Sequence, residues 1–391
     1  MVPEGWQLST IEKIATVSSG GTPSRKNASY WNGNIPWVTT AEVQFKTIFD
    51  TAEKITVDGL NNSSAKLFPK NTILMAMYGQ GKTRGQVAKL GIEATTNQAC
   101  AAILLKEGYE IDYYYQFLIS QYEHIREMSN SGSQENLSAG IVKSIQVPVP
   151  PLFEQKKIAQ ILSTWDKAIA TSEKLLANRQ RQKKALMKKI LTGRDRFSEF
   201  TEKWKHHELS DIAMVQMGSS PKSGAYNENG YGLPLIQGNA DIKNRRSAPR
   251  IFTTEITKEC DVGDILLSVR APVGTVALSS HKACIGRGIS AMRARLGFSQ
   301  NFLYQWFLWF EPRWGALSQG STFESINSDD IKQLKIKLPS LEEQKKIASI
   351  LSNADQEIEL LQQKLHYLKQ EKKALMQQLL TGKRRVKVGA A

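Results

Sequence analysis

The amino-acid sequence predicts an α+β protein in which two mixed α/β domains are separated by two long helices that pair as an antiparallel intramolecular coiled coil. Three observations lead to this prediction: a helical segment that occurs twice, a seven-residue spacing of its apolar residues, and short β-branched runs elsewhere. The 391 residues suffice for two or three domains. A hydrophobic content of 41% excludes a chain that is disordered throughout.

The repeated segment sets the domain boundaries. The sequence around Glu154-Gln155-Lys156-Lys157-Ile158-Ala159 returns 189 residues later as Glu343-Gln344-Lys345-Lys346-Ile347-Ala348, and the match continues to Gly193 and Gly382. The segments before each helix repeat more loosely. We therefore divide the chain into a first domain (1–151), a first helix (152–193), a second domain (194–340), a second helix (341–383) and a basic tail (384–391).

Apolar residues recur at heptad positions in both helices, which predicts that each supercoils against another helix. Because the two seams are about equally long, we expect each helix to pair with the other, although each could instead cover its own domain. Ser172, Arg179, Lys183 and Lys372 are polar members of the seam, and Gly193 and Gly382 suit C-terminal caps. The predicted seam residues are Ile158, Leu162, Trp165, Ile169, Leu176 and Leu186 in the first helix, and Ile347, Leu351, Ile358, Leu361, Leu365, Leu368 and Leu375 in the second.

The two divergent domains contain short strand patterns and one apolar-aromatic helix pattern each. The strands are expected at residues 35–39, 72–77, 265–269, 274–278 and 334–338, and the helices at 113–128 and 302–317. The order of the strands in a sheet does not follow from these patterns.

The net charge of +15 is unevenly distributed. Residues 152–193 carry ten Lys and Arg against three Asp and Glu, and residues 383–391 add four more cations. A solvated basic helix is one interpretation. A nucleic-acid partner is the stronger one, because neutralising phosphates is the most general use of such a surplus.

Several classes of protein are disfavoured. The longest apolar runs, 99–105 and 302–310, are too short to cross a bilayer, and no signal pattern opens the chain, so a cytoplasmic protein without membrane contact is expected. The three cysteines lie far apart, and the five histidines show no metal-ligand spacing, so neither disulfides nor a metal site is expected.

One stretch superficially resembles a nucleotide-binding loop. Residues 76–83 end in Gly81-Lys82-Thr83, but Ala76 replaces the first glycine, and a strand pattern rather than a helix follows. DNA contacts suit this loop better, because Arg and Lys address guanine edges or phosphates and Gln addresses adenine. The candidate DNA-binding residues here are Tyr78, Gln80, Lys82, Thr83, Arg84 and Gln86.

The second domain contains a comparable polar, arginine-rich segment. Its candidate DNA-binding residues are Asn239, Lys243, Arg245, Arg246, Arg270 and Arg287. Two further polar loops precede the helices and could contact phosphate through backbone amides, although a structural loop is the simpler interpretation. These loops contribute Ser133 and Gln134, and Ser321 and Thr322.

Catalysis by this chain is not expected, because no hydrolase, methyltransferase or nucleotide-binding motif is present. Two alternatives stay open: a protein-binding scaffold or inhibitor with two related domains, and an enzyme whose motif is unrecognised. DNA recognition explains best why the helices repeat closely while the domains diverge.

The whole chain resembles the specificity subunit of type I restriction-modification systems. The resemblance is carried by Pro150 through Ala159 and its copy Leu338 through Ala348, each followed by Lys-Ala-Leu-Met and a Leu-Thr-Gly stop, and by Gly81-Lys82-Thr83-Arg84-Gly85. It implies that each domain is a target recognition domain for one half of a bipartite double-stranded DNA site. It also implies that the helices form a spacer that docks two modification subunits, and that restriction subunits join them. No cofactor is implied in this chain, since S-adenosylmethionine would bind the modification subunits.

The repeat suggests where two copies of one partner would dock. We expect the repeated residues Glu154, Gln155 and Lys156, and Glu343, Gln344 and Lys345, to be exposed docking contacts. A helix of about 40 residues is roughly 60 Å long, which predicts half-site centres roughly 10–15 base pairs apart.

Overall fold

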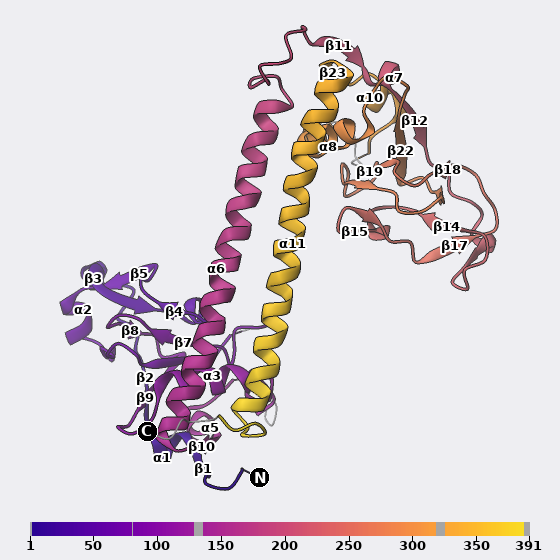
Figure 1. Ribbon diagram of the computed structural model, residues 1–391. Coiled ribbons are helices and arrows are strands. Elements are labelled where there is room, and N and C mark those ends of the chain that lie inside the picture. Colours follow the sequence, from indigo (N-terminus) through magenta and orange to yellow (C-terminus); the bar gives the residue numbers. More distant parts are fainter. Residues whose placement is uncertain (1, 80, 129–135, 318–324, 387–391) are drawn as a thin grey trace. The chain divides into compact units, whose positions relative to one another are not determined.

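The computed structural model describes residues 2–79, 81–128, 136–317 and 325–386 (Figure 1). The chain divides into two compact units. The first unit combines Met1–Glu173 with Gln363–Ala391, and the second is Lys174–Gln362. Each of the two long helices, α6 (Leu152–Ile190) and α11 (Leu341–Leu379), contributes one half to each unit.

Three sheets form the first unit's domain. A five-stranded sheet has the order β2-β9-β6-β7-β4, a three-stranded sheet the order β5-β3-β8, and β1 pairs antiparallel with β10. The strands are β1 (Gln7–Thr10), β2 (Ala15–Ser19), β3 (Trp31–Val38), β4 (Thr47–Ile48), β5 (Glu53–Ile55), β6 (Ile73–Ala76), β7 (Val87–Leu90), β8 (Thr95–Thr96), β9 (Cys100–Leu105) and β10 (Gln146–Val149). The helices are α1 (Ile11–Ile14), α2 (Val57–Asn61), α3 (Ile111–Ser120), α4 (Tyr122–Glu127) and α5 (Ala139–Ser144), with 3-10 turns η1 (Ala28–Tyr30) and η2 (Thr40–Glu42).

The second unit repeats this topology with additions. Its six-stranded sheet has the order β12-β22-β19-β20-β16-β15, its five-stranded sheet the order β13-β17-β14-β21-β18, and β11 pairs antiparallel with β23. The strands are β11 (Lys205–Glu208), β12 (Ala213–Met217), β13 (Tyr226–Asn227), β14 (Leu233–Ile236), β15 (Ile242–Lys243), β16 (Arg246–Ser247), β17 (Ile251–Thr253), β18 (Glu259–Cys260), β19 (Ile265–Ser268), β20 (Val276–Leu278), β21 (Ala283–Ile285), β22 (Ile289–Ala294) and β23 (Lys335–Leu338). The helices are α7 (Leu209–Ile212), α8 (Gln300–Phe310), α9 (Trp314–Leu317) and α10 (Ser328–Lys332), with 3-10 turns η3 (Ser223–Ala225), η4 (Asn239–Asp241) and η5 (Glu311–Arg313).

Both long helices end in the same way. Gly193 and Gly382 follow them with positive φ of 69° and 70°, a conformation that glycine adopts without steric cost. The backbone N–H of Arg194 then donates to the carbonyl of Lys189 at 3.0 Å, and that of Arg384 to the carbonyl of Gln378 at 3.1 Å. These bonds satisfy carbonyls that the last turn of a helix leaves unpaired.

Each unit has its main core where its domain meets the two helices. In the first unit the start of α6 and the end of α11 bury Ile158, Leu162, Met376 and Leu379 against the domain, including Tyr113 of α3. In the second unit the end of α6 and the start of α11 bury Ile190, Ile347 and Leu351 against α8. In both units, therefore, the start of one long helix lies with the end of the other. The predicted fold class and the antiparallel pairing are confirmed.

The two predicted aromatic helices are each interrupted. The first is two helices, α3 and α4, separated by Gln121, whose ψ of 7° leaves the helical range. The second is α8 followed by η5 and α9, and Pro312 lies in this break. A proline lacks the N–H that would continue the helix, which explains the second interruption.

Candidate DNA interface

The described residues of the loop between β6 and β7 include several polar side chains at the surface. Tyr78 is 43% exposed, Lys82 is exposed, and Thr83 and Gln86 are half-buried. Helix α4 holds the loop: the Tyr122 hydroxyl donates to the Lys82 carbonyl, and Arg126 Nη2 donates to the Gly81 carbonyl at 2.9 Å. These bonds anchor the backbone at Gly81 and Lys82, so the exposed Lys82 side chain starts from a held position.

The prediction that Arg84 contacts DNA is wrong for this conformation. Its side chain is only 7% exposed. The residues around it turn back onto the sheet, since Gly85 N–H donates to the Ala76 carbonyl at 2.9 Å and Gln86 N–H to the Thr83 carbonyl at 3.1 Å. This tight turn directs Arg84 inward beneath the loop.

In the second unit, Arg270 and Arg287 lie at one end of the six-stranded sheet. Arg270 follows β19 and Arg287 precedes β22, and these strands pair with Ser268 opposite Ile289. The Val269 N–H donates to the Gly288 carbonyl at 2.9 Å, which holds the two turns together. Both arginines are exposed, so this sheet end presents two cations to solvent.

The remaining candidates of the second unit occupy a separate hairpin. Asn244 and Arg245 have φ of 50° and 61° and connect β15 to β16, as in a tight two-residue hairpin turn. Lys243 and Arg246 beside them are exposed, and Asn239 is half-buried in η4. Arg245 Nη1 donates to Glu311 Oε1 at 2.7 Å and to the Val276 carbonyl at 3.1 Å. Arg245 therefore fastens the hairpin to the domain, and Lys243 and Arg246 are better placed for an external contact.

Five predicted DNA-binding residues lie outside the described residues: Gln80, Ser133, Gln134, Ser321 and Thr322.

The prediction that the repeated start of each long helix is an exposed docking site is wrong for four of its six residues. Glu154 and Gln155 are 2% and 1% exposed, and Glu343 and Gln344 are 1% and 2% exposed. The charged and amide groups are instead turned toward the adjoining domain, which satisfies their hydrogen bonds. Only Lys156 and Lys345 are exposed, and Lys345 Nζ lies 2.9 Å from Glu342 Oε1.

Glu154 joins the two ends of the chain in the first unit. Its carboxylate accepts hydrogen bonds from Trp6 Nε1 at 3.4 Å and from Arg385 Nε at 2.9 Å. Arg385 Nη1 also donates to the Glu4 carbonyl at 2.8 Å. In the second unit Glu343 accepts from Trp204 Nε1 at 3.3 Å and from Arg196 Nη2 at 2.7 Å. The neighbouring carboxylate raises the pKa of both arginine side chains.

Gln155 and Gln344 fasten each domain to the first turn of a long helix. Gln155 Oε1 accepts from the Glu110 N–H at 2.9 Å, and its Nε2 donates to the Pro150 carbonyl at 2.8 Å. Gln344 makes the same two bonds, to the Ser299 N–H and the Pro339 carbonyl, both at 3.0 Å. Because Glu110 and Ser299 precede α3 and α8, these bonds fix each aromatic helix to a spacer helix.

A third repeated contact lies further along the seam. In the first unit Asp166 of α6 accepts from Lys372 Nζ of α11 at 2.6 Å and from Gln116 Nε2 of α3 at 2.6 Å. In the second unit Asp355 of α11 accepts from Lys183 of α6 and from Gln305 Nε2 of α8 at 2.8 Å. The lysine side chains are 12% and 10% exposed, so two of the predicted polar seam residues, Lys372 and Lys183, are mostly buried and paired, whereas the predicted seam residue Arg179 is exposed.

Two tyrosines near these aspartates, Tyr115 and Tyr304, have raised pKa values. Burial raises the pKa of Tyr304 to about 12, with the charge of Asp355 adding to the effect. Burial also raises the pKa of Tyr115, again with an aspartate, Asp166, nearby. Both phenols therefore stay protonated to a higher pH than an exposed tyrosine.

The predicted apolar seam is buried unevenly. Ile158, Leu162, Ile347 and Leu351, near the start of each helix, are fully buried. The other predicted seam residues are half-buried: Trp165, Ile169, Leu176, Leu186, Ile358, Leu361, Leu365, Leu368 and Leu375. In each unit the domain packs against the start of one long helix, which explains why these four residues are buried most completely.

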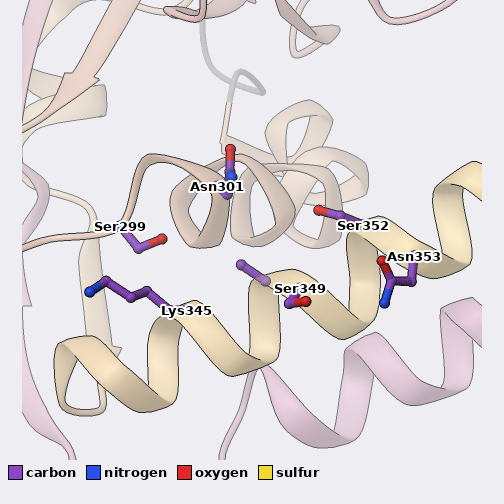
Figure 2. A pocket seen from close by; sticks show the side chains of 7 residues that line it. Ser299, Asn301, Lys345, Ser349, Ser352 and Asn353 are labelled. Carbon is purple, nitrogen blue, oxygen red and sulfur yellow. The ribbon is translucent and has the colours of Figure 1, made fainter.

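A shallow groove of about 300 Å³ lies between α8 and α11 of the second unit (Figure 2). Ser299 and Asn301 line one side, and Lys345, Ser349 and Ser352 line the other. Lys345 thus borders a recess with small polar walls, beside the buried Gln344. At the equivalent place in the sequence of the first unit, Glu110 and Asp112 replace Ser299 and Asn301.

The residues that fix the domains to the helices escaped the sequence analysis, although the repeat contained the signal. Gln116 and Gln305, Asp166 and Asp355, and Arg196 and Arg385 are each 189 residues apart. A polar residue that recurs at this spacing inside an otherwise apolar seam is an indication of a paired buried contact.

The described residues contain neither a cluster of metal ligands nor a membrane-spanning helix. No group of three or more His, Cys, Asp or Glu side chains there could hold a metal ion. No helix in the described part of the chain is long and apolar enough to cross a membrane.

The comparisons with known proteins agree on one family. Residues 3–178 and 201–370 match the family described as the type I restriction modification DNA specificity domain. The chain is 30% identical to the putative type I restriction enzyme MjaX specificity subunit of Methanocaldococcus jannaschii, over 99% of this chain and 95% of that protein. It is also 30% identical to the EcoR124I/EcoR124II specificity subunit of Escherichia coli over 40% of each chain.

Solved structures share the fold. The S subunit of a type I restriction-modification system from M. genitalium matches with a TM-score of 0.65 and 17% identity, over 97% of this chain and 96% of that one. A chain from a structure of a type I R-M system, described for its assembly and conformational transition, matches with a TM-score of 0.63 and 24% identity, over 98% and 100%.

Proposed function

Because this chain belongs to the type I restriction-modification specificity subunits and has two recognition domains, we propose that each domain reads one half of a bipartite DNA site. One observation carries this proposal. The same buried contacts, made by Glu154 and Glu343, fix both domains to the helix pair, whereas the exposed loops differ. Two domains that are attached to the helices in the same way but expose different loops are suited to reading two different half-sites.

The loops supply a chemically suitable reading surface. Tyr78 and Lys82 in the first unit, and Arg270 and Arg287 in the second, project from turns held by backbone hydrogen bonds. Arginine and lysine can donate to guanine O6 and N7 or to phosphate, and turns that are already held avoid the entropy cost of ordering the backbone on binding. We therefore assign Lys82 to the first half-site and Arg270 and Arg287 to the second.

We further propose that the chain is not itself catalytic and needs no cofactor. Two modification subunits would supply S-adenosylmethionine-dependent adenine methylation, and restriction subunits would join the same complex. The modification subunits would dock near Lys156 and Lys345, which are the exposed members of the repeated helix start, and the groove beside Lys345 offers a recess for a partner side chain.

Methylome sequencing of cells that express the chain with its modification subunit tests the DNA-reading proposal. A new bipartite motif with methyladenine in both halves is expected. Replacing residues 198–340 with those of another specificity subunit should change one half of the motif and leave the other intact. A motif that changes in both halves, or a single contiguous motif, would contradict the assignment.

Charge reversal tests the docking site separately. Lys156→Glu with Lys345→Glu should reduce co-purification of the modification subunit, because both copies of the contact are altered. Lys364→Glu with Lys373→Glu changes the same number of exposed cations on α11 and serves as the control. Equal co-purification of the two variants would contradict docking at the helix starts.

A further inference from the structure

The two long helices differ in charge along one row of positions. Helix α6 carries Lys167, Lys174, Arg181 and Lys188 at a spacing of seven residues. In α11, 189 residues later, Gln356, Gln363, Gln370 and Gln377 occupy the matching positions, although Lys183 through Met187 return unchanged as Lys372 through Met376. Lys, Arg and Gln have similar helix propensities, so the substitution removes charge and little else.

Three of these cations, Lys174, Arg181 and Lys188, belong to the second unit, and we call them the basic stripe. A spacing of seven residues is just under two helical turns, so the three side chains share one face of α6, about 10.5 Å apart along the axis. Lys183 of the seam lies two residues beyond Arg181, roughly 200° around the helix axis. The stripe therefore faces away from α11, and all three residues are exposed.

The stripe keeps its positive charge unpaired among the described residues. Three other cations of this half of α6 are paired, Lys183 with Asp355, Arg179 with Glu357 and Lys189 with Asp195, whereas the exposed Lys184 has no ion pair there. Within the described chain, no ion pair involves the three stripe residues. Arg181 donates only within its own helix, to Asn178 Oδ1 at 2.5 Å and to the Ala177 carbonyl at 3.4 Å.

We propose that the basic stripe binds the phosphate backbone of DNA, so that one spacer helix contributes affinity without reading sequence. This inference rests on the DNA-binding function proposed above. Single cations on flexible stems, repeated along a rod, match a polyanion with regularly spaced charges. No aromatic side chain occurs at the stripe positions to stack on a base, and phosphate contacts carry no sequence information directly.

The stripe also makes the two spacer helices unequal. The contacts made by Glu154 and Glu343, and by Asp166 and Asp355, repeat closely in the two units. The cations of this row do not repeat, because α6 carries them and α11 has glutamines at the matching positions. DNA thus experiences a stronger attraction toward α6 than toward the glutamine row of α11.

The test is the salt dependence of DNA binding by the full chain. The variant Lys174→Gln, Arg181→Gln, Lys188→Gln copies the residues that α11 already tolerates. The control, Lys157→Gln, Lys364→Gln, Lys373→Gln, removes three exposed cations that lie outside the stripe. Dissociation constants are measured between 50 and 300 mM salt for two DNA duplexes. One carries the bipartite motif identified by methylome sequencing, and the other has an unrelated sequence.

Each phosphate contact contributes about 0.9 to the slope of log K against log salt, so losing three should flatten the slope by up to about 2.7. Both duplexes should bind at least about tenfold more weakly at 0.1 M salt, and their ratio of affinities should not change. The variant Lys174→Arg, Lys188→Arg should keep the wild-type slope. An equal slope for the stripe variant and the control would overturn the inference.

The two proposals fail in distinguishable ways. If wild-type protein does not prefer the motif duplex over the unrelated one, the proposed recognition function fails. If it does prefer that duplex but the stripe variant keeps the wild-type slope, only the inference about the stripe fails, and the α6 cations would then serve a protein partner or solubility. Circular dichroism checks that each variant retains its helices.

Discussion

The partly buried pair of Asp166 and Lys372 should stabilise the first unit more than an exposed pair between the same two helices. Asp166→Asn removes the carboxylate from a lysine whose side chain is only 12% exposed. Breaking fully buried pairs costs about 3–5 kcal/mol, and exposed pairs are worth about 0.2–1 kcal/mol. Because the Asp166 side chain is 46% exposed and so partly screened by water, we expect a loss of about 2 kcal/mol.

A double-mutant cycle measures this pair. Asp166→Asn, Lys372→Gln and the double variant are compared by urea unfolding, and the double variant should recover most of the loss because no unpaired charge stays buried. Glu173 and Lys369 provide the matched control, since they pair at 2.7 Å between α6 and α11 but are 48% and 53% exposed. Glu173→Gln should cost no more than about 0.5 kcal/mol. Equal losses at Asp166 and Glu173 would refute the argument that burial decides the effect.

Three further outcomes are expected. Leu351→Ala, at a fully buried seam position, should lower the free energy of unfolding by about 2–5 kcal/mol, while Leu360→Ala, 65% exposed on the same helix, should stay within about 0.5 kcal/mol in a urea titration. Gly274→Ala places a methyl group 2.7 Å from Trp314 Cβ at a φ of 90° and should lower the melting temperature more than Gly297→Ala, where φ is 89° and nothing lies within 4 Å. Arg270→Ala should relax or weaken recognition of one half-site only, which methylome sequencing reads directly, and a change in the other half would contradict its placement.

The fold was largely predictable because its strongest signal is periodic. Heptads such as Ile347, Ala354 and Leu361 define a helix and its buried face without any other information. The strand order was not predictable, since β4 and β16, with two residues each, give no pattern of their own. Pairing partners distant in the chain, such as β1 with β10, depend on tertiary contacts that local propensity does not contain.

The site was predicted less well, and for a specific reason. Residue type identified Glu154 and Gln155 as polar and therefore exposed, but Trp6, Arg385 and the Glu110 N–H satisfy them inside the protein. Arg84 was misplaced in the same way, because a turn of four residues decides which way its side chain points. To predict exposed cations such as Lys82 and Arg270, it was enough to locate the ends of the strands, and the structure has both residues exposed after a strand end.

The first unit is built from two segments that lie far apart in the sequence, so it cannot be completed until the end of the chain has been synthesised. The second unit is one continuous stretch, Lys174–Gln362, whereas the first also needs the segment that begins at Gln363. The module translated first is thus the last that can be completed, because Glu154 and Asp166 await Arg385 and Lys372. A prematurely terminated chain would carry one finished module and one with an unpaired buried carboxylate. We expect such a product to be more open to proteolysis than the full chain, because an unpaired buried carboxylate destabilises the first unit.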